Sequence, residues 1–196
     1  MRKMNNPKIY PIKININLAL SYDVEQFCRS VNQAMVEEGL NDINFKNDNH
    51  IPHITLLMGH IRSESDYLKL IQSCSDFASL KSEIKYKISK PYWKKPLENF
   101  VFVNILPLEE FGKFRLSLDA SIKGLIDYSD HGSPDSLTHI TLGYSGLKNP
   151  DNEMLIASFL NTPSGVADSI RICRAGSHGT CNEIFNEFHL SKDAIA

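Results

Sequence analysis

One tetrapeptide, His-Ile-Thr-Leu, occurs twice in this chain, at residues 53–56 and again at residues 139–142. The two copies are 86 residues apart (139 − 53). Each copy begins 33 residues after the end of an apolar, strand-like segment, which ends at Leu20 in the first half and at Leu106 in the second. A stretch with helical spacing of apolar residues separates segment and motif both times. The sequence therefore predicts a duplicated unit of strand, helix and motif.

The remaining pattern alternates between the periods of strands and helices. Apolar and polar residues alternate over residues 12–20, as in a half-buried strand. We expect further strands at 51–57, 83–89, 100–106, 137–143, 166–174 and 183–190. Helical spacing predicts helices at 21–38, 63–80 and 108–126, and a short one at 151–160. Ser21 and Ser63 are suitable N-caps for the first two helices. The class is therefore mixed α and β.

The composition is that of a folded domain. Hydrophobic residues make up 42% and charged residues 22% of the 196 residues, which favours a packed core over disorder. We expect one domain, residues 1–196, in which two lobes share a core. The net charge of −2 argues against a protein that coats long nucleic acids by charge, because such proteins need a basic face. A small phosphorylated ligand or a nucleic-acid end needs only a local group of donors.

The sequence also bears on the compartment. No long apolar stretch follows the basic N-terminus, so we expect no signal peptide. Lys13, Asn15 and Asn17 interrupt the apolar residues of the first strand and exclude a membrane span there. Without an export signal or a C-x-x-C motif, we expect a cytoplasmic protein with reduced thiols. The four cysteines are Cys28, Cys74, Cys173 and Cys181.

The repeated motif suits phosphoryl chemistry. In a strand, residues i and i+2 point to the same face, so His53 and Thr55 share a face, as do His139 and Thr141. Of two opposed histidines, one can take a proton from an attacking water and the other can protonate a leaving ribose oxygen. Each threonine hydroxyl can donate to a phosphate oxygen. This arrangement requires no metal and no cofactor.

Five further residues are candidates for substrate binding, and each has a plainer alternative. Asn17 and Asn104 lie on the first strand of each unit. They could contact ligand if that strand neighbours the motif strand, or they could lie on a solvated sheet face. Phe102 and Tyr144 could stack on a nucleobase, or they could belong to the core. His178 belongs to a third His-x-Thr, which lacks the apolar frame. It could line the ligand site, or mark a turn at Gly179.

The two motifs resemble those of the 2H phosphoesterase superfamily, which includes 2′-5′ RNA ligase-like proteins and cyclic nucleotide phosphodiesterases. The resemblance implies a bilobal α+β fold, with two antiparallel sheets that form a central cleft and helices on the outside. It implies metal-independent phosphodiester chemistry, with His53, Thr55, His139 and Thr141 as the catalytic residues. For opening a 2′,3′-cyclic phosphate, it implies His139 as the base and His53 as the acid.

The expected function is hydrolysis of 2′,3′-cyclic phosphates or 2′-5′ linkages in RNA ends, small nucleotides or oligonucleotide signals. The alternatives are a nucleotide-binding module of the same fold without turnover and a structural protein in which the repeats are merely strands. Two complete motifs weigh against loss of activity. We expect a monomer whose substrate is selected by three loops, at residues 41–49, 91–99 and 129–136.

Overall fold

The protein folds around two antiparallel sheets. The computed structural model describes residues 10–46, 50–93, 100–128, 132–133, 138–144 and 155–192. The first sheet has the order β10 (Cys181–His189), β9 (Ser169–Ala175), β1 (Ile12–Leu18), β2 (Ile54–Ile61) and β6 (Asp127–Tyr128). The second has the order β4 (Tyr92–Trp93), β5 (Phe100–Leu106), β3 (Ile84–Ile88) and β8 (Ser164–Ala167), and β7 (His139–Tyr144) also pairs with β5. The expected α+β fold with two antiparallel sheets is confirmed.

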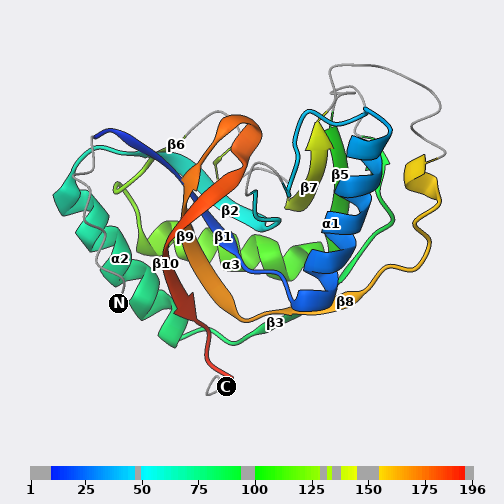
Figure 1. The fold of residues 1–196 in the computed structure, drawn as a ribbon. Helices are drawn as coiled ribbons and strands as arrows, with labels where there is room; N and C mark the ends of the chain where they lie inside the picture. The colour runs from blue at the N-terminus through cyan, green and yellow to red at the C-terminus, as the bar shows by residue number, and fades with distance from the viewer. Residues whose placement is uncertain are drawn as a thin grey trace.

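Three long helices of the described ranges pack on the strands of the two sheets (Figure 1). They are α1 (Tyr22–Glu37), α2 (Glu64–Ser79) and α3 (Leu108–Ser121). Helix α1 follows β1 of the first sheet but packs on β7 and β8 of the second, while α3 follows β5 and contacts both β5 and β2. Helix α2 packs on β2, β9 and β10. Because helices of one half pack against strands of the other, the two halves of the chain are interlocked.

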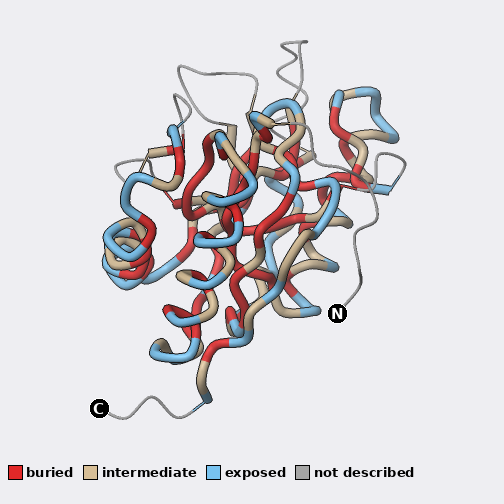
Figure 2. Tube along the Cα trace, turned by 90° about the vertical axis from the view of Figure 1, so that its left-hand side faces the viewer, coloured by how far each residue is buried: buried red, intermediate tan, exposed pale blue. Residues whose placement is uncertain are grey.

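Strand β1 is central to the first sheet, between β2 and β9. Figure 2 shows buried residues gathered in the interior of the trace, with exposed residues along its outer turns. The five residues 14–18 are fully buried, including Asn15 and Asn17. The sequence pattern left open a solvated face for Asn17, and the structure excludes it. Polar side chains in such a strand need partners inside the protein.

The duplication extends to residue pairing. In the first sheet, Thr55 of the motif pairs with Asn17, and the register of β1 against β2 shifts directly before Asn17. In the second, Thr141 pairs with Phe102, and the register of β5 against β7 shifts directly before Phe102. Both motifs therefore occupy equivalent places beside the first strand of their unit. Asn17 and Phe102 are structural counterparts.

Several element boundaries differ from the sequence prediction. The strand expected at 166–174 is two strands, β8 and β9, which belong to different sheets and are separated by Asp168. The helix expected to reach residue 126 ends at Ser121, and Gly124, with a φ of 80°, could not continue it. Of the short helix expected at 151–160, residues 155–157 are helical and 151–154 lie outside the described residues.

The two serines predicted as N-caps behave differently. Ser63 Oγ accepts a hydrogen bond from the Asp66 backbone N–H, which confirms the predicted cap. Ser21 is the N-cap of α1, but its side chain makes no capping bond. Its backbone N–H instead donates to the Tyr86 hydroxyl at 3.4 Å.

The cysteine prediction was half wrong. Cys28 and Cys74 are free and buried, but Cys173 and Cys181 form a disulfide with a Cα–Cα distance of 5.7 Å. Their strands, β9 and β10, are antiparallel neighbours, which brings residues eight apart in sequence within bonding reach. Reduced thiols were expected because the sequence shows no export signal, and the structure contradicts that expectation for this pair. No helix in the described ranges is long and apolar enough to cross a membrane.

Candidate active site

His53 lies directly before β2 and is only 9% exposed. Its Nδ1 lies 2.7 Å from the Ile51 backbone oxygen, and its Nε2 lies 3.1 Å from Asn15 Nδ2. A carbonyl oxygen only accepts hydrogen bonds and an amide nitrogen only donates them. The proton of the neutral ring is therefore on Nδ1, and Nε2 carries a lone pair.

Burial controls the charge of His53. It lowers the pKa of this imidazole to about 4, and the positive charges of Arg171 and His50 act in the same direction. Backbone hydrogen bonding to Ile51 and Gly179 counters part of this effect. At neutral pH His53 is therefore uncharged and able to accept a proton. This state suits a general base and differs from the acid role implied by the resemblance.

An amide group holds the first motif together. Asn15 Nδ2 donates to Gly179 O at 3.0 Å and to Thr55 Oγ1 at 3.3 Å, in addition to His53 Nε2. Asn17 Nδ2 donates to Asn15 Oδ1 at 3.1 Å. Asn17 was predicted as a substrate-binding residue. Because it is fully buried behind Asn15, it has no atom exposed to a ligand in this structure.

The second motif has an aromatic environment. His139 and Thr141 lie on β7 and are partly exposed, and His139 pairs with Asn104. The Phe102 ring centroid lies 4.0 Å from that of His139. Asn104 Oδ1 accepts a hydrogen bond from the Tyr92 hydroxyl at 2.7 Å. Phe102 and Asn104 therefore lie beside the second motif, and Phe102 is largely buried. Their roles in substrate binding stay predictions.

An aromatic contact joins the two sheets. His178 lies in the 3-10 turn η1 (Ser177–Gly179) between β9 and β10, and Tyr144 ends β7. Their rings stack, with centroids 4.1 Å apart and an interplanar angle of 18°. Phe100 contacts both rings, at 4.9 Å from Tyr144 and 6.0 Å from His178. Two predicted substrate-binding residues from different sheets are thus brought together, and His178 is exposed.

The two motif strands also contact each other, and α3 supports the first of them. Strands β2 and β7 are in contact, and α3 packs on β2. Arg115 of α3 is 2% exposed and donates to the Thr55 backbone oxygen at 2.9 Å. Burial lowers the pKa of this guanidinium to about 10. Sequence reasoning missed Arg115, although a charged residue between Phe111 and Leu118 on an apolar helix stripe was a visible signal.

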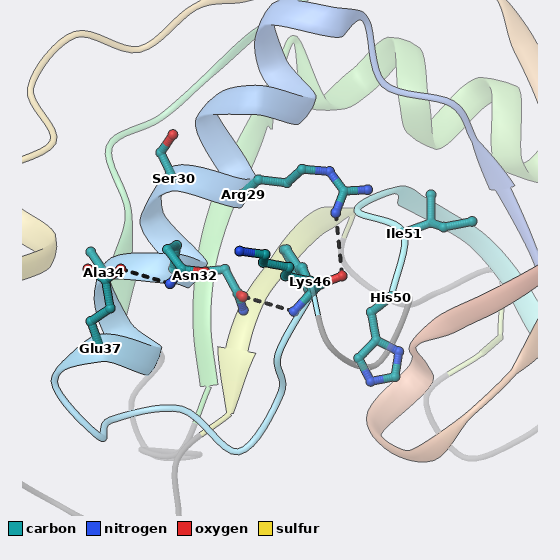
Figure 3. A pocket seen from close by; sticks show the side chains of 10 residues that line it. Arg29, Ser30, Asn32, Ala34, Glu37, Lys46, His50 and Ile51 are labelled. Atoms are coloured by element: carbon teal, nitrogen blue, oxygen red, sulfur yellow. Dashed lines mark hydrogen bonds between the residues drawn. The ribbon is translucent and has the colours of Figure 1, made fainter.

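A cavity of about 780 Å³ lies between α1 and the segment that leads to His53 (Figure 3). Its lining includes Arg29, Asn32, Lys46, His50 and Ile51. Arg29 is engaged by Glu25 at 2.8 Å and by the Phe45 backbone oxygen at 3.5 Å. The cavity is lined by none of the four motif residues. We therefore assign the candidate active site to the motif strands and not to this cavity.

The spacing His50-x-x-His53 resembles a metal-binding pair. In the structure, His50 Nδ1 lies 2.9 Å from Asn182 Oδ1, and both ring nitrogens of His53 contact protein groups. In the described part of the chain, no group of three or more His, Cys, Asp or Glu side chains could hold a metal ion.

The arrangement of strands and helices has counterparts among solved structures. TT0787 of Thermus thermophilus matches with a TM-score of 0.65 at 15% identity, over 91% of this chain and 98% of that one. E. coli LigT in apo form matches with a TM-score of 0.64 at 11% identity, over 92% and 98%. The chain has the fold of LigT. A protein described as a phosphoesterase matches with a TM-score of 0.60 at 12% identity, over 92% and 99%.

The LigT fold confirms the resemblance drawn from the two motifs, as far as the fold is concerned. No protein-family model and no curated protein matches the sequence. Within the LigT fold, the chain places one His-Ile-Thr-Leu motif at the start of β2 and one at the start of β7, in contacting strands.

Proposed function

We propose that this chain is a metal-independent phosphodiesterase that hydrolyses 2′,3′-cyclic phosphates or 2′-5′ linkages. Its substrates would be RNA ends, small nucleotides or oligonucleotide signals. One observation carries the proposal. Two identical motifs occupy equivalent registers in two contacting strands of a LigT fold. His53 and His139 would be the acid–base pair, and Thr55 and Thr141 the phosphate donors.

The neutral state of His53 suggests which histidine acts as the base and which as the acid. Water attacks phosphorus while its proton passes to His53 Nε2, whose lone pair gives up the hydrogen bond from Asn15 Nδ2, and the P–O bond to the ribose oxygen breaks. That oxygen leaves with a proton from His139, which is partly exposed and lies close to Phe102. The resemblance implied the opposite assignment. Ring closure would use the same groups with the roles exchanged.

The aromatic contacts suggest how a nucleotide is held. Stacking on aromatic rings tolerates any base, because every base has a π-face. The stacked pair Tyr144 and His178, with Phe102 and Asn104 nearby, would form the base-binding side of the site. LigT has been crystallised with phosphate, with ATP and with 3′-AMP, which supports a nucleotide substrate here. We propose a monomer and retain the cytoplasm as the proposed compartment.

A panel of substrates in EDTA tests this function. It would contain 2′,3′-cyclic mononucleotides, an RNA oligomer with a 2′,3′-cyclic end and 2′-5′-linked oligoadenylate. Turnover by the wild type, absent from the folded double variant His53→Ala/His139→Ala, supports the proposal and identifies the substrate. Binding of nucleotides without turnover of any substrate would favour a binding module of the same fold.

A further inference from the structure

A buried chain of hydrogen bonds runs from the Cys173–Cys181 disulfide to His53. Asn17 Nδ2 donates to Cys173 Sγ at 3.3 Å and to Asn15 Oδ1 at 3.1 Å. Asn15 Nδ2 then donates to His53 Nε2 at 3.1 Å. Cys173, Asn17 and Asn15 are all fully buried. Since each of these groups is removed from water, its partners within the protein decide its orientation.

The chemistry of sulfur decides which groups donate and which accept along these hydrogen bonds. A disulfide sulfur carries no hydrogen and can only accept, so Asn17 must turn its NH₂ group toward Cys173. The opposite end of that amide, Asn17 Oδ1, is buried and has no hydrogen-bond partner in the described structure. An unsatisfied buried oxygen is unfavourable, which indicates that the orientation is imposed by neighbouring groups.

The hairpin closed by the disulfide supplies a second constraint. Gly179 lies between the two cysteines, and its backbone oxygen accepts from Asn15 Nδ2 at 3.0 Å. The acceptors that orient both amides, Cys173 Sγ and Gly179 O, therefore belong to one disulfide-closed loop. As a result, the NH₂ group of Asn15 faces the lone pair of His53.

The charged and titratable groups around His53 take no part in the hydrogen bonds that link Cys173, Asn17, Asn15 and His53. Arg171 on β9 acts on His53 and is paired with Glu187 on β10 at 2.7 Å. His50, from the segment before β2, acts on it as well and contacts Asn182 Oδ1. None of these groups bonds to Asn15 or Asn17 in the contacts described.

We propose that Asn15 and Asn17 are positioning residues of the active site, and that the oxidation state of the Cys173–Cys181 pair sets the orientation of both amides. The consequence for turnover rests on the proposed function, whereas the consequence for His53 does not. A dithiol reductant would transfer two electrons and two protons to the disulfide. The S–S bond would break to give two protein thiols, and the reductant would become a disulfide.

Reduction would exchange the donor and acceptor roles along these hydrogen bonds between Cys173 and His53. The Cys173 thiol can donate its hydrogen to Asn17 Oδ1, the atom that now lacks a partner. Both amides can then turn over, because Asn17 no longer faces a sulfur that can only accept. Asn15 Oδ1 would face His53 Nε2 and stabilise a proton on it. The reduced protein should therefore hold His53 in its protonated form to a higher pH.

The test is a nitrogen-15 NMR titration of the histidines, before and after reduction with dithiothreitol, with a mass increase of two hydrogens as proof of reduction. We expect the pKa of His53 to rise by at least about one unit on reduction. Cys173→Ser/Cys181→Ser should show the raised value without reductant. Asn15→Ala should show no response to reduction, and Cys74→Ala should respond like the wild type.

An unchanged His53 titration after proven reduction of the folded wild type would overturn the inference, whether or not the serine variant folds. So would a full response in Asn15→Ala. A redox response of His53 in a protein that turns over no ribose phosphodiester would uphold the inference while rejecting the proposed function. Turnover together with an identical His53 titration in both redox states would uphold the proposed function and reject the inference.

Discussion

At the scale of single residues, the site depends on how each histidine is charged. His53 is buried, bears its proton on Nδ1 and presents a lone pair, whereas His139 is partly exposed beside Phe102. The sequence predicted both histidines and both threonines as a set, because strand periodicity assigns them to common faces. It could not predict the charge of His53. The burial of this side chain depends on residues distant in the sequence, such as Asn15 and Gly179.

The proposed acid role of His139 predicts a dependence on the leaving group. A p-nitrophenyl nucleotide ester releases p-nitrophenolate, which leaves without needing a proton. His139→Ala should lose about 10²–10⁴-fold in kcat/KM on a 2′,3′-cyclic nucleotide but far less on this ester. His53→Ala should lose activity on both substrates. Equal losses for the two variants on both substrates would contradict the assignment.

Burial of a neutral His53 also predicts acid sensitivity. Its pKa in the folded protein is about 4, below the ordinary value near 6.5, so the unfolded chain binds a proton first as the pH falls. Stability should decline between about pH 6.5 and pH 4, by up to about 3 kcal/mol from this residue. Urea denaturation across this window should show a smaller decline in His53→Gln. His60→Gln, outside the buried site, should decline like the wild type.

At the scale of elements, long periodic segments were predictable and short ones were not. Strand β5 and most of the three long helices follow from periodicity, because each presents a clear apolar face. Strands β4 and β6 have two residues each, too few to show a period. The passage from β8 to β9 looks like one strand in sequence, since nothing local marks the change of sheet at Asp168. Of the three proposed specificity loops, residues 47–49, 94–99, 129–131 and 134–136 lie outside the described ranges.

The stacking of η1 on β7 predicts a role in binding rather than chemistry. Tyr144→Ala and His178→Ala should each raise KM by about 10-fold with little change in kcat, because base stacking contributes ~1–3 kcal/mol. Steady-state kinetics on the nucleotide turned over fastest would measure this. Tyr22→Ala removes an exposed aromatic at the start of α1 and should change neither constant. A selective fall in kcat would point to a catalytic role instead.

The contact of α3 with β2 predicts that Arg115 supports Thr55. Arg115→Met retains most of the volume but removes the donor to the Thr55 backbone oxygen. We expect a loss of about 1–3 kcal/mol in unfolding free energy and a clear fall in kcat. Urea denaturation and kinetics would be measured together, with Arg62→Met as the exposed control. An unchanged kcat in Arg115→Met would show that Arg115 does not support the active site.

At the scale of the whole molecule, the duplicated sequence becomes two interlocked sheets. The repeat could be predicted from the sequence because motif and spacing recur. The matched registers of Thr55 and Thr141 show that the backbone repeats as well. The exchange of helices between halves could not be predicted, since an apolar stripe does not specify the sheet on which a helix packs. Nor could the disulfide, because its two cysteines become neighbours only when β9 and β10 pair.

The central claim is that two histidines from equivalent units serve one reaction. Its most direct test is kcat/KM on a 2′,3′-cyclic nucleotide in EDTA for the wild type and for His53→Ala, His139→Ala and His60→Ala, all shown to be folded. The account predicts a loss of at least about 100-fold for each motif variant and none for His60→Ala. Full activity in either motif variant would contradict it.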